Sequence, residues 1–287
     1  MAIENAMPMG FLESVVHATD FSPASERAFA HALAIAVLRR TELTLLHVTS
    51  GEHRDWTGFP AVRKTLERWN LLPPGSKQED VLAAVGVRVS KIEISSRFPS
   101  LAVASWLESH PTDLLVVATE GREGVARWLH SSKAEAMARW SRTMTLFVPA
   151  DAERSIVSAA DGRLQLGSVL VPVDRLPDPS AAIELARRAA DVVGDGEVKI
   201  GLLHVGDAAS MPRLATEDGP RWKFEREVRA GDPVDEIVTA AARRAADLLV
   251  MPTAGRHGVF EALSGSTTER VLRRAPCPVL AVPARER

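Results

Sequence analysis

The sequence predicts an α/β protein with two tandem domains, each built around a doubly wound parallel sheet. Three observations support this prediction. The chain has 287 residues, and domains commonly have roughly 100 to 200 residues, so two domains are expected. Short β-branched runs alternate with alanine-rich segments of helical length, which is typical of βαβ units. A series of short motifs also occurs twice in the same order.

The repeated motifs align the two halves of the chain. Each half has a β-branched run that ends in an aspartate, Asp20 or Asp174. The motifs that follow are Leu-Leu-His-Val at 45–48 and 202–205, Asp-Leu-Leu-Val at 113–116 and 247–250, Gly-Arg at 121–122 and 255–256, and Val-Pro-Ala at 148–150 and 282–284. Their shared order predicts an internal duplication.

The spacing of the motifs locates a difference in length between the repeats. The histidines His47 and His204 are 157 residues apart, whereas from Asp113 onward the motifs recur after 134 residues. The first repeat therefore holds about 23 additional residues, in the segment 51–85, whose apolar residues could form one face of a helix. The matching segment 206–221 is short and contains two prolines, which favours no helix there.

The elements of the second repeat follow from its pattern. We expect strands at 168–173, 198–205, 224–229, 247–251 and 278–282, with helices in most of the gaps. Asp178-Pro179 and Asp232-Pro233 have the residue types of an N-cap followed by the first helical position, and Asp235 would lie in the first turn. Ser22-Pro23 and Pro99-Ser100 have similar positions in the first repeat. The expected domains are 1–150 and 168–287, with a polar linker at 151–167.

Composition narrows the class of protein. The formal net charge is −2, so no overall basic field favours nucleic acid or an anionic membrane as a partner. No segment approaches the ~18 apolar residues of a membrane helix, and the first residues lack the pattern of a secretory signal. The single cysteine, Cys277, excludes an intrachain disulfide and a cysteine-rich zinc site. A cytoplasmic protein is expected.

Ligands of open parallel sheets bind beyond the carboxyl ends of the strands. In the second repeat three segments should meet there: Pro172-Val173-Asp174, His204-Val205, and the run from Pro252 to Gly258 that leads to residues 264–268. Glycines let backbone N–H groups approach an anion, and hydroxyl groups and Arg256 could add contacts to a phosphate. The run matches neither a Walker A loop nor a dinucleotide-binding G-x-G-x-x-G motif.

These motifs, taken in order, resemble those of the universal stress protein family. The resemblance includes three further features: Gly231-Asp-Pro before the third helix, the glycine-rich run, and the ending Arg-Arg-Ala-Pro-Cys-Pro-Val-Leu-Ala-Val. The resemblance covers nearly the whole chain, once per repeat. Nucleotide-binding members of this family have the motif G-x2-G-x9-G-[ST]. The second repeat has Pro252-x2-Gly255-x9-Gly265-Ser266, which departs from the motif at the first glycine. Proline lacks an N–H group, so one contact to a nucleotide could be lost or reshaped there.

The resemblance implies adenine-nucleotide alpha-hydrolase-like domains and a stress-response protein that binds ATP or another adenine nucleotide, with or without Mg²⁺, as a ligand-gated regulator without efficient catalysis. Its final strands, at 145–148 and 279–282, would pair the repeats into an internal pseudo-dimer, and whole chains could dimerise further. The implied nucleotide-binding residues are Pro172, Val173, Asp174, Val205, Pro252, Gly255, Arg256, Gly265, Ser266 and Thr267.

The first repeat has a degenerate form of the motif. It has Ala118-x2-Gly121-x9-Ser131-Ser132, so two of the three glycines are absent, and we expect weak nucleotide binding or none. The residues that retain the outline of a second site are Asp20, Val48, Gly121, Arg122 and Ser132.

Other interpretations remain open from the sequence. The chain could be an interaction module that has lost nucleotide binding, with a protein partner that the sequence does not identify, or a slow hydrolase that uses the same pocket. Structural roles are favoured for three residues: His47 and His204 are expected to be core residues rather than metal ligands, and Cys277 a packing residue. A hydrolytic triad of Asp174, His257 and Ser266 is disfavoured because Ser266 lies in no G-x-S-x-G elbow. The six tryptophans are expected to be packing or interface anchors.

Overall fold

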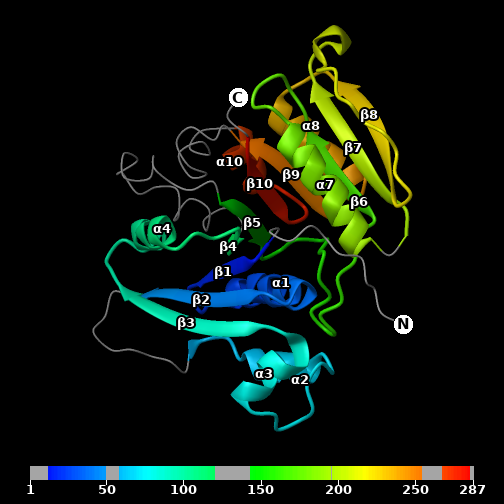
Figure 1. The fold of residues 1–287 in the computed structure, drawn as a ribbon. Coiled ribbons are helices and arrows are strands. Elements are labelled where there is room, and N and C mark those ends of the chain that lie inside the picture. Colours follow the sequence, from blue (N-terminus) through cyan, green and yellow to red (C-terminus); the bar gives the residue numbers. More distant parts are fainter. Residues whose placement is uncertain (1–11, 50–57, 120–142, 195, 254–266, 285–287) are drawn as a thin grey trace.

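A computed structural model of the protein describes residues 12–49, 58–119, 143–194, 196–253 and 267–284. These residues form one ten-stranded sheet with helices on both faces (Figure 1). The predicted α/β class with two tandem parallel-sheet domains is confirmed.

The first half supplies one side of this sheet. Its strands are β1 (Ser14–Thr19), β2 (Glu42–Thr49), β3 (Arg88–Ser95), β4 (Leu114–Thr119) and β5 (Met144–Pro149), in the spatial order β3-β2-β1-β4-β5. All neighbouring strands within this half run parallel. The reversal of order at β1 is the switch point of a doubly wound fold.

The second half repeats the arrangement. Its strands are β6 (Ser168–Pro172), β7 (Val198–Val205), β8 (Trp222–Arg229), β9 (Leu248–Thr253) and β10 (Val279–Pro283), in the order β10-β9-β6-β7-β8. These are the five predicted strands, with small differences at their ends.

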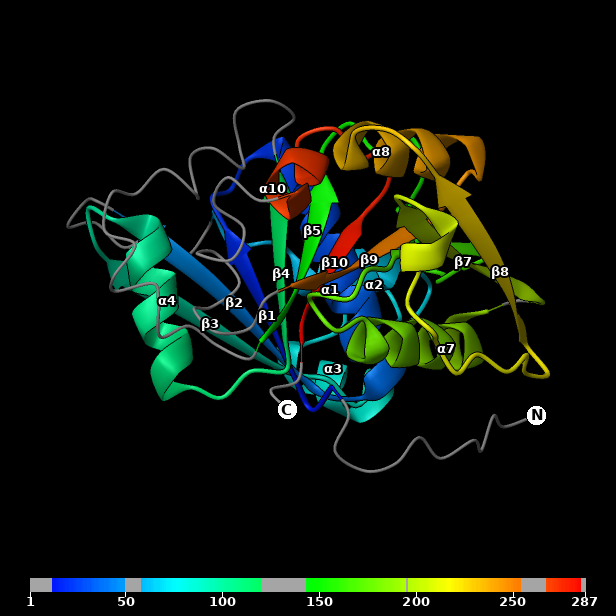
Figure 2. The same cartoon turned by 90° about the horizontal axis from the view of Figure 1, so that it is seen from above.

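The two halves join through their last strands. β5 and β10 run antiparallel, with Phe147 opposite Val279, Leu146 opposite Leu280 and Thr145 opposite Ala281. Figure 2 shows these two strands side by side at the centre of the molecule. The predicted pairing of the repeats is confirmed, and it leaves β3 and β8 as the edges of the sheet.

Helices cover the sheet in two layers. The helices α1 (Pro23–Arg39) and α7 (Ser180–Val193) bury their apolar side chains in one core cluster. The helices α4 (Pro99–Ser109), α8 (Pro233–Arg243) and α10 (Thr267–Leu272) pack in a second cluster on the opposite face. Strand residues alternate between the two clusters, as expected for a sheet covered on both sides.

Two predicted helix starts are confirmed and two are adjusted. Ser22 caps α1 by accepting a hydrogen bond from Ser25 N, and Asp232 caps α8 by accepting from the N–H groups of Val234 and Asp235. The expected cap pair Asp178-Pro179 is wrong by one residue: Pro179 is the N-cap and α7 begins at Ser180, whose N–H and hydroxyl both donate hydrogen bonds to the Asp178 carboxylate. Pro99 does begin α4, but Phe98 before it provides no side-chain cap.

The additional residues of the first repeat form two short helices, α2 (Val62–Arg68) and α3 (Gln78–Val85). Leu66 of α2, Val81 of α3 and Trp69, which follows α2, are buried, whereas Leu82 of α3 is exposed. The matching segment of the second repeat contains one short 3₁₀ turn, η2 (Ala208–Ser210), and no α-helix. Both expectations from the spacing of the motifs are confirmed.

The segment between the halves packs against both of them. Ile156 and Val157 are buried, and the indole of Trp69 donates a hydrogen bond to Ala159 O at 3.2 Å. Arg154 forms an ion pair with Asp247 of the second half, with 2.6 Å between Nη2 and Oδ1. No helix in the described ranges is both long and apolar enough to cross a membrane.

Candidate functional site

A cavity of about 180 Å³ lies at the carboxyl ends of β6, β7 and β9. The strands contribute Pro172, Leu203 and Met251, and α8 contributes Ile237. Six of the predicted site residues line this cavity: Pro172, Val173, Asp174, Val205, Pro252 and Thr267. The remaining four, Gly255, Arg256, Gly265 and Ser266, lie outside the described residues.

Asp174 supplies the only ionisable side chain among the described residues that line this cavity. It follows the end of β6 and is exposed, and its Oδ1 accepts a hydrogen bond from Arg175 N at 2.7 Å. Val205, the last residue of β7, is half-buried and also lines the cavity. Thr267 begins α10 and adds a hydroxyl group. Thr268, the next residue, also lines the cavity. The cavity therefore combines apolar walls with one carboxylate and two threonine hydroxyl groups.

Two prolines shape the opening of the cavity. In the first half, β1 and β4 are paired from Val15 with Leu114 to Ala18 with Val117. In the second half, β6 and β9 are paired only at Val169 with Leu248 and at Leu170 with Leu249. Pro172 and Pro252 stand where the first repeat has Ala18 and Ala118, and neither proline has an N–H group for the ladder. The pairing of β6 with β9 therefore ends closer to the start of the strands than the pairing of β1 with β4, and both prolines line the cavity beyond it.

The repeated histidines are structural. His204 is buried, with Nδ1 3.1 Å from Val173 O and Nε2 2.8 Å from Ser210 Oγ. His47 lies with Nδ1 2.8 Å from Thr19 O, and its ring stacks on Phe21. The interpretation as a hydrogen-bonded core residue is confirmed for His204, whereas His47 is hydrogen-bonded but only half-buried. Each ring contacts the end of the neighbouring strand next to a cavity. His257, which the sequence analysis considered as a member of a hydrolytic triad, lies outside the described residues.

The first half has a related cavity of about 370 Å³ at the carboxyl ends of β1 and β2. Asp20 and Val48, both predicted, line it, whereas Gly121, Arg122 and Ser132 lie outside the described residues. Arg97 also lines it, and the sequence prediction missed this residue. The repeat offset of 134 residues aligns Arg97 with Gly231, so the alignment of the halves contained the signal.

Cys277 and the described tryptophans have packing roles. Cys277 is fully buried, and burial raises the pKa of its thiol to about 12, so the reactive thiolate is suppressed. Trp69 and Trp222 are buried, and Trp106 stacks on His110. Trp56, Trp128 and Trp140 lie outside the described residues. In the described part of the chain, no three histidine, cysteine or acidic side chains are grouped as a metal site would require.

The fold and the cavities define a tandem α/β protein with a cavity at the strand ends of each half. The sequence profile of the universal stress protein family matches residues 12–149 and 214–283, which together exceed half of the chain. The protein belongs to the universal stress protein family. The resemblance of its motifs to that family is thereby confirmed.

Known proteins also share the tandem arrangement. A universal stress protein from Mycolicibacterium smegmatis is 26% identical over 98% of this chain and 99% of its own length. One from Mycobacterium tuberculosis is 24% identical over 93% of this chain and 95% of its own. A solved universal stress protein from Archaeoglobus fulgidus superimposes with a TM-score of 0.58 at 18% identity, covering 96% of this chain and 97% of that protein. At 18% identity, this structural similarity supports the fold only.

Proposed function

We propose that the C-terminal domain, residues 168–287, binds ATP or another adenine nucleotide, and that the chain works as a ligand-gated regulator rather than an efficient enzyme. The observation that carries the proposal is the convergence of Asp174, Val205, Pro252 and Thr267 on one cavity at the switch point of the second half. These residues come from four separate segments, yet they meet where ligands of doubly wound sheets bind.

The cavity suits the parts of an adenine nucleotide. Its apolar side chains, among them Val205, Ile237 and Met251, offer a surface for a flat base. The Asp174 carboxylate can accept hydrogen bonds from ribose hydroxyl groups. Thr267 lies on the side from which the glycine-containing run 255–266 joins α10, and the residues of that run are suited to phosphate.

The side chains favour binding over turnover. General acid–base catalysis needs a proton acceptor and a proton donor placed at the reacting atoms. Among the described lining residues, Asp174 alone is ionisable, and it already accepts a hydrogen bond from its neighbour. A regulator that responds to occupancy of the cavity fits this composition better than a hydrolase.

The N-terminal domain, residues 1–150, is proposed to bind adenine nucleotides weakly or not at all. Its cavity contains Arg97 where the second half has Gly231. The long side chain of Arg97 occupies space beside the strand ends that Gly231 leaves open in the second half. The two absent motif glycines, replaced by Ala118 and Ser131, add to this difference.

An interaction module without nucleotide is the second candidate, because Pro252 removes one backbone donor from the motif. Calorimetric titration with ATP separates the candidates. We expect saturable binding by the wild type, a loss of at least about tenfold in affinity for Gly265→Val, whose Cβ would obstruct an anion, and little change for Gly121→Val. Absence of binding at millimolar ATP would favour the interaction module, and a large loss in Gly121→Val alone would move the site to the first half.

A further inference from the structure

A groove of about 830 Å³ lies beside the edge strand β3 of the first half. Its other wall is formed by α2 and α3, which have no counterpart in the second repeat, and Figure 1 shows them beside the beginning of β3. The apolar part of its lining includes the buried Phe59 and the half-exposed Leu82. The groove shares no lining residue with the cavity of the proposed nucleotide site, so it is a separate surface.

The edge strand β3 has backbone groups without a partner. Successive residues of a strand point their N–H and C=O groups alternately to the two sides. Ser96 N donates to Thr49 O of β2 at 2.8 Å, so the even-numbered residues of β3 face β2. Val89, Lys91 and Glu93 therefore face outward, and no described residue forms a hydrogen bond with their backbone groups. This edge can accept another strand.

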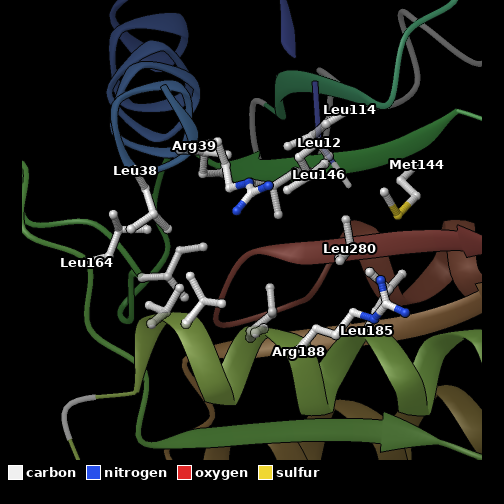
Figure 3. Close-up of a pocket in the computed structure, with 16 residues that line it drawn as sticks. Leu12, Leu38, Arg39, Leu114, Met144, Leu146, Leu164, Leu185, Arg188 and Leu280 are labelled. Atoms are coloured by element: carbon white, nitrogen blue, oxygen red, sulfur yellow. The ribbon is translucent and has the colours of Figure 1, made fainter. Parts of the chain in front are cut away.

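Other parts of the described sheet do not offer such an edge. On the other edge strand, β8, Gly219 N donates to Trp222 O at 3.0 Å, and Phe224 N donates to Asp218 Oδ1 at 2.9 Å, so the chain covers its own edge. A smaller cavity of about 100 Å³ between the two halves, shown in Figure 3, is lined in part by β4, β5, β9 and β10. These are interior strands, which are paired on both sides.

The charged side chains that line the groove are mostly cationic. They are Arg63, Lys64, Glu79, Arg88 and Lys91. Arg88 is paired with Glu42 of β2 at 2.9 Å. Glu79 is paired with Lys77 at 3.7 Å. The charge balance of the groove therefore depends on the other three cations.

Arg63, Lys64 and Lys91 have no carboxylate partner among the described residues. Arg63 donates to Ser76 O at 2.9 Å, and the Lys91 ammonium lies 5.4 Å from the centre of the Phe59 ring. Neither contact neutralises a charge. Partial desolvation and the nearby Arg63 charge lower the pKa of Lys91, so positive charges act on one another here. A carboxylate placed in the groove would relieve this repulsion.

We propose that β3 and this groove bind an acidic, extended segment of a partner protein, which adds a strand to the sheet. Main-chain hydrogen bonds with Val89 and Lys91 supply affinity, and carboxylates on alternate residues of the segment meet the cations of the groove. A second copy of this chain fits less well, because β3 against β3 would set Lys91 of one copy near Lys91 of the other.

Fluorescence anisotropy with a labelled heptapeptide of alternating glutamate and valine tests the class of partner. We expect saturable binding, and at least about tenfold weaker binding of a heptapeptide in which lysine replaces glutamate. The acidic heptapeptide with N-methylated amides should not bind, because it cannot donate to β3. Equal binding of the N-methylated peptide, or tighter binding of a single-stranded oligonucleotide of the same charge, would overturn strand addition.

Two double variants with the same change in net charge locate the site. Lys64→Gln/Lys91→Gln should weaken binding of the acidic heptapeptide by at least about fivefold. Lys199→Gln/Lys223→Gln removes two cations from β7 and β8, near the other edge of the sheet, and should leave the affinity unchanged. All four lysines are exposed, so both variants should fold. Equal effects would show attraction by overall charge and would overturn the location.

Amide hydrogen exchange measured by NMR identifies the paired backbone groups. In the free protein, Val89 and Lys91 should exchange fast, whereas Ser90 and Ile92, which face β2, should exchange slowly. The acidic heptapeptide should slow Val89 and Lys91 alone. Signals that shift without this protection would overturn strand addition, and protection that rises with protein concentration in the absence of peptide would make a second copy the occupant. These results do not depend on whether ATP binds.

Discussion

The aspartate of each Asp-Leu-Leu-Val motif is repeated because it holds the start of the neighbouring strand. Asp113 Oδ2 accepts hydrogen bonds from Glu13 N at 2.7 Å and Ser14 N at 3.0 Å. Asp247 Oδ2 accepts from Gly167 N at 2.8 Å and Ser168 N at 3.0 Å. The motif therefore reports a structural contact between β1 and β4 and between β6 and β9, not a catalytic carboxylate.

His17 and His31 make the stability of the protein depend on pH. His17 Nδ1 lies 3.0 Å from Val116 O, and His31 Nε2 lies 3.1 Å from Ser155 Oγ of the linker. Burial lowers the pKa of both side chains from 6.5 to about 4. The folded state therefore favours neutral imidazole, whereas the unfolded chain binds a proton below about pH 6.5, so stability is present above that pH and is lost as the pH falls toward 4.

We predict that the free energy of unfolding falls between pH 6.5 and 4 by about 3 kcal/mol for each of these histidines, an order-of-magnitude figure. Urea denaturation at a series of pH values measures it. Acidic groups also titrate in this range, so the matched measurement is His31→Gln, whose pH slope should be shallower by about one proton. An unchanged slope in His31→Gln would contradict the assignment.

At the scale of the elements, α2 and the residues after it hold the linker in place. Gly162 adopts φ +70°, and a Cβ added there would lie 2.3 Å from the Trp69 ring. The indole also donates its hydrogen bond to Ala159 O. The additional segment of the first repeat thus has a function in the fold, since it receives the chain that crosses to the second half.

Gly162→Ala should destabilise the protein by about 2 kcal/mol or more, because it combines a left-handed backbone with a clash against a buried ring. Gly75→Ala is the control: Gly75 has φ +80° but no atom within 4 Å of an added Cβ, so about 1 kcal/mol is expected. Urea denaturation compares the two variants. Equal losses would show that Trp69 does not hold the linker turn.

Pro172 and Pro252 set the shape of the proposed nucleotide site. Because β6 and β9 part after Leu170 and Leu249, the cavity opens between them. Pro252→Gly restores both the motif glycine and the missing N–H group. We predict about tenfold tighter ATP binding by calorimetry, the value of one added hydrogen bond to a charged group. Ala118→Gly, the same change in the first repeat, should create no comparable binding, and weaker binding by Pro252→Gly would contradict the role given to the proline.

At the scale of the whole molecule, the sequence predicted the duplication, the strands of the second repeat, the additional helices and the pairing of β5 with β10. The duplication, the strands and the additional helices depend on local hydrophobic patterns or on the register of repeated motifs, both of which are visible in one dimension. The pairing of β5 with β10 was implied by the resemblance to the family. The approach of Pro172, Val205 and Thr267 was also predictable, because strand ends of a parallel sheet meet at one edge.

Other features depend on side chains that meet only after folding. Arg97 lines the first cavity at the position of Gly231, but Arg97-Phe98-Pro99 does not match the Gly-Asp-Pro motif, so only the alignment of the two repeats points to it. α7 begins one residue later than predicted, and Asp178 bonds to Ser180 N–H without a further cap bond like the one that Asp232 makes to Asp235 N–H, a difference that the residue types alone leave open. The pairing of β6 with β9 ends two residues earlier than that of β1 with β4, and this difference is seen only when the two halves of the structure are compared.

The central claim is that a duplicated chain retains one nucleotide site, in its second half. Native mass spectrometry of the full chain with millimolar ATP tests this claim most directly, because it counts bound nucleotides per chain. We predict one ATP per chain for the wild type and for Gly121→Val, and none for Gly265→Val. Two nucleotides per chain, or none in the wild type, would contradict the account.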